Sequence, residues 1–410
     1  MIAGCSDIID RPGATDSERD EALRLRAVGN FELGHMEASL ADFTAFISLK
    51  PDYAYAYGAR ALVYDRLNDF DSTIADASKA IALDPRYAFA YATRASAYES
   101  KGDVTHARAD YDEAIRLKPD MPHYYRGRGL LRKGLSDVDG AIADFSAAIR
   151  LDPGDFLALG FRGGAYFMKK EFDKAMADFN AAVQLKPGDR FLHLSRAELR
   201  LDRGDNDGAI ADLGQAIAAN PNDPHSYVDR GIAFSRKGDF ASAIPDYDAA
   251  LKLRPNDPTI RNRRAHAHFI TGHFAEAGAD FGDVVAKTPE YDLAKLLRYI
   301  ARARSGDYDM GELKRNTDTL DREGWPWPMV AVYLGQMTRD EMLAKMKDMR
   351  LADDFGACGV SFYLGQYLMV KRKPQEALPY LKQAAEMCRG DGEFERDAAR
   401  NELKRQQASN

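Results

Sequence analysis

Proline recurs in this chain at a fixed interval of 34 residues, and no other feature of the sequence restricts the fold as strongly. A proline cannot continue an α-helix, because it lacks a backbone N–H and its ring clashes with the preceding turn. The evenly spaced prolines therefore divide the chain into units of equal length, each ending where a helix must stop. They are Pro51, Pro85, Pro119, Pro153, Pro187, Pro221, Pro255 and Pro289.

Each unit has the residue pattern of two antiparallel helices. We number a unit so that its proline is position 32. Position 8 is alanine or glycine, and positions 20 and 27 are mostly alanine, as at Ala95, Ala107 and Ala114 of the third unit. Small residues at these positions let two helices approach closely. Position 24 is mainly large and aromatic, as at Tyr111, and is expected to fill the space between neighbouring pairs.

One helix pair cannot bury its apolar face alone, so the units are expected to stack. The period and the small-residue pattern resemble those of the tetratricopeptide-repeat (TPR) family over residues 18–289. The resemblance implies an all-α fold, a superhelical solenoid of antiparallel helix pairs. It also implies a protein that binds other proteins or peptides on the concave wall formed by the first helix of each pair.

The overall charge and the missing motifs narrow the function classes. A formal net charge of -7 disfavours nucleic-acid binding, which requires a basic face. The sequence holds no nucleotide-binding, serine-hydrolase or zinc-protease motif. His266, His268 and His273 lie close together in sequence, but helical residues two apart face different sides, so we expect no metal site. We therefore predict a protein that is not an enzyme and needs no cofactor.

Two charged positions recur in all the units, arginine at position 7 and aspartate at position 23. Each arginine is supplied with one aspartate, so we expect a structural ladder of ion pairs along the stack. An arginine row that grips acidic partners is the alternative. The pairs are Arg26 with Asp42, Arg60 with Asp76, Arg94 with Asp110, Arg128 with Asp144, Arg162 with Asp178, Arg196 with Asp212, Arg230 with Asp246, and Arg264 with Asp280.

The concave wall of the family is lined by positions 2, 5, 9, 12 and 13. In units 2–4 these positions hold a mixed polar set that includes Tyr55, Asp65 and Arg126, whereas units 5–8 are rich in apolar residues. Because an exposed apolar strip is unusual without a partner, we expect it to receive a hydrophobic helix or an extended peptide. Packing between repeats or against the C-terminal segment is the alternative. The candidate groove residues are Leu157, Phe167, Phe191, Leu194, Leu201, Val228, Ile232 and Phe269.

The period fades after Pro289. We expect a degenerate helical hairpin and a break at Trp325-Pro326-Trp327-Pro328 (residues 290–328), where the two prolines favour extended backbone. Residues 329–410 then contain a final TPR unit and a capping helix at Asp391–Gln407. The runs "WPWPMVAVYLGQ" and "FYLGQYLMVKRKPQEALPYLKQA" are similar to the C-terminal half of NlpI-type bacterial lipoproteins, over about residues 291–407. The resemblance implies an envelope adaptor for proteases or peptidoglycan hydrolases, and a homodimer as one arrangement. This chain departs from that group in size, because eight regular repeats precede the similar region.

The three cysteines give information on where in the cell the protein works. Ile2-Ala3-Gly4-Cys5-Ser6 matches a lipobox, which would lipidate Cys5 at the end of a flexible segment, residues 1–17. Chance explains the match equally well, because only four residues precede Cys5.

Cys358 and Cys388 fall at positions 1 and 31 of the final unit, where a hairpin brings its two ends together. A disulfide there would contribute about 3 kcal/mol, and two unrelated buried thiols are the alternative. A lipidated Cys5 with this disulfide favours the periplasm and an outer-membrane lipoprotein. A cytoplasmic adaptor for a secretion, pilus or regulatory complex is the alternative if Met1 is the true start.

Overall fold

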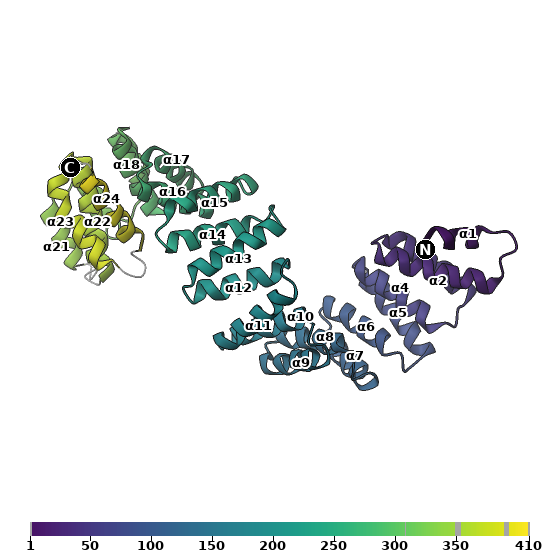
Figure 1. Ribbon diagram of the computed structural model, residues 1–410. Coiled ribbons are helices and arrows are strands. Elements are labelled where there is room, and N and C mark those ends of the chain that lie inside the picture. The colour runs from purple at the N-terminus through teal and green to yellow at the C-terminus, as the bar shows by residue number, and fades with distance from the viewer. Residues whose placement is uncertain (1, 308, 349–353, 389–392, 409–410) are drawn as a thin grey trace. The chain divides into compact units, whose positions relative to one another are not determined.

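The computed structural model describes residues 2–307, 309–348, 354–388 and 393–408. All the regular elements in these ranges are α-helices, arranged as successive antiparallel pairs (Figure 1). The all-α repeat fold expected from the 34-residue period is confirmed. The chain forms two compact units, Met1–Pro187 and Gly188–Asn410, and each is described by itself.

The first unit begins with a single helix, α1, and continues with five helix pairs, α2/α3 to α10/α11. The helices of a pair are joined by short turns, and each pair ends at one of the periodic prolines. The bounds are α1 Ile2–Asp10, α2 Asp16–Glu32, α3 Met36–Leu49, α4 Ala54–Arg66, α5 Phe70–Leu83, α6 Ala88–Ser100, α7 Val104–Leu117, α8 Pro122–Gly134, α9 Val138–Leu151, α10 Phe156–Met168 and α11 Phe172–Leu185.

The second unit contains three more regular pairs, α12/α13 to α16/α17, followed by the C-terminal helices. The bounds are α12 Arg190–Asp202, α13 Asn206–Ala219, α14 Pro224–Arg236, α15 Phe240–Leu253, α16 Pro258–Thr271, α17 Phe274–Lys287, α18 Asp292–Ser305, α19 Met310–Thr317, α20 Trp327–Tyr333, α21 Arg339–Asp348, α22 Asp354–Val370, α23 Pro374–Met387 and α24 Glu393–Ala408.

Local chemistry sets the ends of these helices. In the third pair, Gly102 adopts a φ of 78°, a left-handed conformation that glycine reaches without strain, and the chain turns back there. The next residue, Asp103, is the N-cap of α7, and its carboxylate accepts a hydrogen bond from the backbone N–H of His106. Pro122, Pro224 and Pro258 open the first helices of their pairs, where the missing N–H costs nothing.

Position 8 is small because the aromatic ring of position 24 presses against its backbone. A Cβ built at Gly129 would lie 2.6 Å from the Cε1 atom of Phe145, and one at Gly231 would lie 2.6 Å from the Cε1 atom of Tyr247. Real Cβ atoms do not approach other atoms so closely. Both rings are buried. The small residue and the large one therefore form a single packing unit that repeats along the solenoid.

The N-terminal segment differs from our expectation. We predicted that residues 1–17 are flexible, but Ile2–Asp10 form α1, which packs on α2. The hydroxyl of Ser6 accepts a hydrogen bond of 2.9 Å from Nη1 of Arg26, and Cys5 is buried. The apolar residues of α1 cover the end of the first repeat, which would otherwise be exposed, and this burial orders the segment.

The break between α19 and α20 ends earlier than we predicted. Thr317 ends α19, and α20 already begins at Trp327, so Trp327 and Pro328 are helical and not extended. Pro328 stands in the first turn of α20, where a proline removes no helical hydrogen bond. Further along, Thr338 and Glu341 exchange the hydrogen bonds of a capping box at the start of α21.

The final pair, α22 and α23, is followed by α24. The expected capping helix at Asp391–Gln407 begins at Glu393 in the structure, and residues 391 and 392 lie outside the described ranges. Besides polar residues, α24 carries a buried face that includes Ala398, Ala399 and Glu402. The helix therefore packs into the second unit and closes its apolar core.

Candidate functional site

The arginine and aspartate of positions 7 and 23 lie together in all eight repeats. Nε and Nη2 of each arginine donate to the two carboxylate oxygens of its aspartate. In the second repeat, Arg60 Nε lies 2.6 Å from Asp76 Oδ2, and Nη2 lies 2.9 Å from Oδ1. The same two-point geometry joins the other pairs, Arg26–Asp42, Arg94–Asp110, Arg128–Asp144, Arg162–Asp178, Arg196–Asp212, Arg230–Asp246 and Arg264–Asp280.

Several of these arginines also reach the preceding repeat through Nη1, a contact that we did not predict. Arg60 Nη1 donates to Thr44 Oγ1 at 3.1 Å, and Arg128 Nη1 donates to Asp112 Oδ1 at 2.6 Å. Both acceptors occupy position 25. Hydrogen bonding to the aspartate raises the pKa of the Arg60 guanidinium. An arginine of this kind connects two helices of its own repeat with the repeat before it, which is a structural arrangement.

The predicted groove residues are divided between the two units and differ in exposure. In the first unit, Leu157 and Phe167 are half-buried, and the Phe167 ring lies 5.9 Å from that of Phe172. In the second unit, Val228 and Ile232 are half-buried, whereas Phe191 is 42% exposed. Leu194 and Leu201, also in the second unit, line a pocket with Phe191.

Phe269 is a wrong assignment, because it belongs to the core. Only 1% of its surface is exposed. Its ring lies 5.7 Å from that of Phe394 in α24 and 6.3 Å from that of Phe362 in α22. The C-terminal helices cover this part of the first helix of repeat 8. A partner polypeptide therefore cannot reach Phe269, and packing against the C-terminal segment is the correct interpretation at this position.

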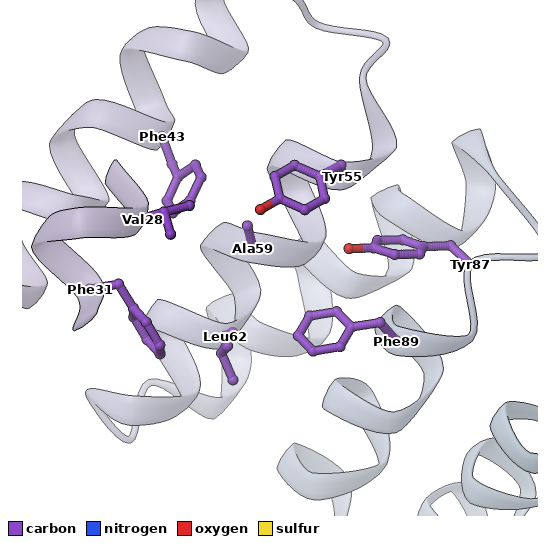
Figure 2. A pocket seen from close by; sticks show the side chains of 8 residues that line it. All are labelled: Val28, Phe31, Phe43, Tyr55, Ala59, Leu62, Tyr87 and Phe89. Atoms are coloured by element: carbon purple, nitrogen blue, oxygen red, sulfur yellow. The ribbon is translucent and has the colours of Figure 1, made fainter. Parts of the chain in front are cut away.

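A strongly apolar pocket lies in repeats 1–3, and its part in repeats 2 and 3 falls where we had expected a mixed polar wall. We call it the α2–α6 pocket. Its volume is about 260 Å³. Side chains from α2, α3, α4 and the start of α6 surround one hollow, and none of them is charged (Figure 2). They are Val28, Phe31, Phe43, Tyr55, Ala59, Leu62, Tyr87 and Phe89.

A glycine makes room for one wall of this pocket. A Cβ built at Gly58 would lie 2.5 Å from Cε1 of Tyr87, so the tyrosine ring rests directly on the backbone of α4. In Figure 2 the Tyr87 hydroxyl points towards Ala59, beside the ring of Phe89. Burial raises the pKa of the Tyr87 phenol. Any side chain in place of Gly58 would displace Tyr87 and change the shape of the pocket.

The α2–α6 pocket was missed for two reasons. Repeat 1 supplies Val28 and Phe31 at positions 9 and 12, and we had compared the walls only from repeat 2 onward. Tyr87 lies in the connection before α6, outside the five wall positions. The apolar residues at position 2 of repeats 2 and 3, Tyr55 and Phe89, were the signal in the sequence that could have revealed the pocket.

The cysteines lie in two separate places. Cys358 in α22 and Cys388 at the C-cap of α23 form a disulfide with a Cα–Cα distance of 5.0 Å, which closes the open end of the last pair. Cys5 is a free thiol buried in α1. In the described ranges, no three His, Cys, Asp or Glu side chains are placed to hold a metal ion. No helix in the same ranges combines the length and the apolar character needed to span a membrane.

Comparison with known proteins agrees with this geometry. The family model of the tetratricopeptide repeat matches residues 59–122, 92–156, 126–190, 194–258 and 228–292, which together exceed half of the chain. None of the curated proteins matches the sequence.

Several solved structures are similar to the chain. A tetratricopeptide-repeat protein from Parabacteroides merdae is 20% identical, with a TM-score of 0.44 over 60% of this chain and 97% of that chain. YrrB, a TPR protein with an unusual peptide-binding site, is 22% identical, with a TM-score of 0.37 over 48% of this chain and 97% of that chain. A chain of the APC/C hetero-tetramer Cut9–Hcn1 is 17% identical, with a TM-score of 0.47 over 70% of this chain and 56% of that chain.

Proposed function

The chain belongs to the tetratricopeptide-repeat family, and from this premise we propose that it is a non-catalytic scaffold that holds a partner polypeptide in the α2–α6 pocket. The observation that carries the proposal is the lining of that pocket. Its eight side chains are apolar or tyrosine, and they come from three successive repeats. A concave apolar site with a few polar atoms at its edge is the usual form of a binding pocket for a partner side chain.

The chemistry of the pocket defines the partner. The lining offers large ring faces from Phe31, Phe89 and Tyr87, and two phenol hydroxyls from Tyr55 and Tyr87 for hydrogen bonds. The occupant is therefore a large aliphatic or aromatic side chain of an extended or helical peptide, with its backbone near the exposed Tyr55. A charged side chain would lose its hydration there without gaining a counter-charge, so it is excluded.

Peptide display on the full chain tests the proposal. Peptides selected from a random library should share a large apolar residue, and Leu62→Asp should weaken their binding about 100-fold, because it places a carboxylate in the pocket. Leu33→Asp is the matched control, since Leu33 is 64% exposed and lies outside the lining. Isothermal calorimetry measures the affinity, and circular dichroism verifies folding.

Gly58→Ala supplies an independent variant that displaces Tyr87 without adding charge. The proposal fails if no peptide is selected, or if the selected peptides bind the Leu62→Asp and Gly58→Ala proteins as tightly as the original chain. Leu62 and Gly58 do not belong to the Arg–Asp ladder, so a loss of binding in either variant reports on the α2–α6 pocket and not on the ladder.

We also propose that the scaffold works in an oxidising compartment of the bacterial envelope, as an adaptor for proteases or peptidoglycan hydrolases. The disulfide between Cys358 and Cys388 supports this location, since such bonds persist outside reducing cytoplasm. The resemblance of residues 291–407 to NlpI-type lipoproteins supports the envelope role. Attachment of a lipid at Cys5 and a homodimer belong to the same proposal.

Thiol counting on protein isolated from its own cell tests the location. After denaturation without reductant, we expect at most one reactive thiol, that of Cys5, and none if Cys5 is lipidated. Three reactive thiols would contradict the envelope proposal and favour a cytoplasmic adaptor for a secretion, pilus or regulatory complex. Mass spectrometry of the N-terminal peptide reads the state of Cys5 directly.

A further inference from the structure

A second pocket, in the second unit, has a different chemistry from the α2–α6 pocket. We call it the α12–α14 pocket, and its volume is about 520 Å³. One side is apolar: Phe191, Leu194 and Leu201 come from α12, and the buried Leu213 comes from α13. The other side is polar and carries the charged residues Arg190, Glu198, Asp223 and Asp229 together with His225.

Two of these polar groups already have charged or polar partners. Asp223 accepts a hydrogen bond of 2.7 Å from Arg190 Nη2 and another of 2.5 Å from Ser226 Oγ, and these contacts lower its pKa despite burial. Nε2 of His225 accepts a hydrogen bond of 2.9 Å from Arg254 Nη2. The Arg190–Asp223 pair is therefore neutral as a unit and contributes no net charge to the pocket.

Glu198 and Asp229 are different. Among the described residues, no lysine, arginine or histidine forms an ion pair with either carboxylate. Asp229 is half-buried, and its burial raises the pKa of the carboxyl, with the negative charges of Asp223 and Glu198 acting in the same direction. The positive charge of the exposed Arg263 opposes this shift. Two carboxylates thus border an apolar wall and lack a cation between them.

We propose that the α12–α14 pocket binds an arginine side chain of a partner polypeptide, with an apolar residue next to it in the partner sequence. A guanidinium is planar and carries five N–H donors, so it can pair with Glu198 and Asp229 together. Its methylene stem and the neighbouring apolar residue lie against Leu194, Leu201 and the face of Phe191.

This inference rests on the proposed binding function but assigns a second site with its own specificity. The α2–α6 pocket has no charged residue in its lining and excludes cations, whereas the α12–α14 pocket selects them. The two units therefore recognise two chemically different peptide segments. A partner that carried only large apolar side chains would engage the first unit alone.

The experiment uses the same display library on the full chain and sorts the selected peptides by their sensitivity to two variants. Peptides that lose affinity with Glu198→Gln plus Asp229→Asn should contain an arginine beside an apolar residue, and the loss should be about 10-fold or more. Their affinity should also fall as salt is raised, because the contact is ionic. Replacing that arginine with citrulline, which keeps the shape and removes the charge, should produce a similar loss.

Asp207→Asn is the matched control, because Asp207 is an exposed acidic residue of the same unit outside the pocket. The inference is overturned if no selected peptide is sensitive to the Glu198 and Asp229 changes, or if the sensitive peptides carry no arginine. Peptides that respond only to Leu62→Asp would leave the proposed function standing and remove the second site. If the selected peptides lose affinity only with Glu198→Gln plus Asp229→Asn, the second site stands and the proposed function of the α2–α6 pocket fails.

Discussion

The regular repeats and the C-terminal helices are both stacks of helices, but their polar contacts span very different distances along the chain. In each repeat the recurring ion pair joins an arginine and an aspartate 16 residues apart. In the C-terminal part, Arg304 of α18 donates to Gln366 of α22, 62 residues away, and to Glu402 of α24, 98 residues away. Arg405 of α24 donates to the backbone oxygen of Ile270, 135 residues away.

This difference teaches how each region is held in place. A repeat contacts mainly its neighbours, so its stability is a sum of similar local terms. The C-terminal helices are held together by a few buried polar groups, some of which form hydrogen bonds to more than one other helix. Glu402 has 1% of its side chain exposed, and Glu395 is buried beside the Tyr363 hydroxyl, 3.0 Å away. Loss of one such group should affect more of the structure than loss of one repeat pair.

The largest effect is expected from Arg304→Ala. It removes the guanidinium, 11% exposed, that pairs with Glu402 and lies 4.4 Å from the ring of Phe274. The buried Glu402 then keeps only Arg405 and Gln406 as partners, and Gln366 loses its hydrogen bond from Arg304. Because these buried contacts are lost together, the free energy of unfolding of the second unit should fall by about 4 kcal/mol. Urea unfolding followed by circular dichroism measures the loss. Arg315→Ala, at an ion pair 69% exposed on the arginine side, should leave the unfolding midpoint unchanged.

A smaller loss of unfolding free energy is expected when the pH is lowered. The His266 ring is stacked on Phe394 at 4.3 Å, its Nε2 is buried without a hydrogen-bond partner, and burial lowers its pKa to about 4. The unfolded chain, with a histidine pKa near 6.5, binds a proton that the folded chain does not bind between pH 6.5 and 4. Stability is therefore full above about pH 6.5 and falls by roughly 3 kcal/mol as the pH drops towards 4.

His266→Phe isolates this contribution, because phenylalanine keeps the stack with Phe394 and cannot titrate. The difference in unfolding free energy between the two proteins should change between pH 6.5 and 4 and stay constant above pH 7. Other acid-sensitive groups, including Glu395, are the same in both proteins and cancel. A difference that is independent of pH would show that His266 has the same pKa in the folded and the unfolded chain.

The smallest of the three effects is expected from Arg162→Ala. It breaks the pair with Asp178, whose carboxylate is 9% exposed, and the contact with Ser146 of the preceding repeat. Arg162 itself is 21% exposed, so water can reach Asp178 after the truncation, and the loss should be about 2 kcal/mol. Peptide binding in the α2–α6 pocket should remain. Lys169→Ala, which removes an exposed ion pair with Asp139, should have no measurable effect on unfolding.

A loss for Arg162→Ala as large as that for Arg304→Ala would end the distinction between local and long-range stabilisation. Unchanged unfolding with lost peptide binding would instead favour the alternative in which the arginine row grips acidic partners. The two measurements together therefore separate the structural interpretation of the ladder from the functional one.

The sequence by itself determined the repeats: the spacing of the prolines, the small residues at position 8 and the paired charges require only contacts within a repeat or with its neighbour, and such contacts follow the period. Only the tertiary structure decided which apolar residues stay accessible to a partner. Phe269 fits the groove pattern and is covered by α24, whereas Val28 and Tyr87 complete a pocket from different repeats. Exposure depends on segments far away in sequence that pack against a residue, and periodicity contains no information about them.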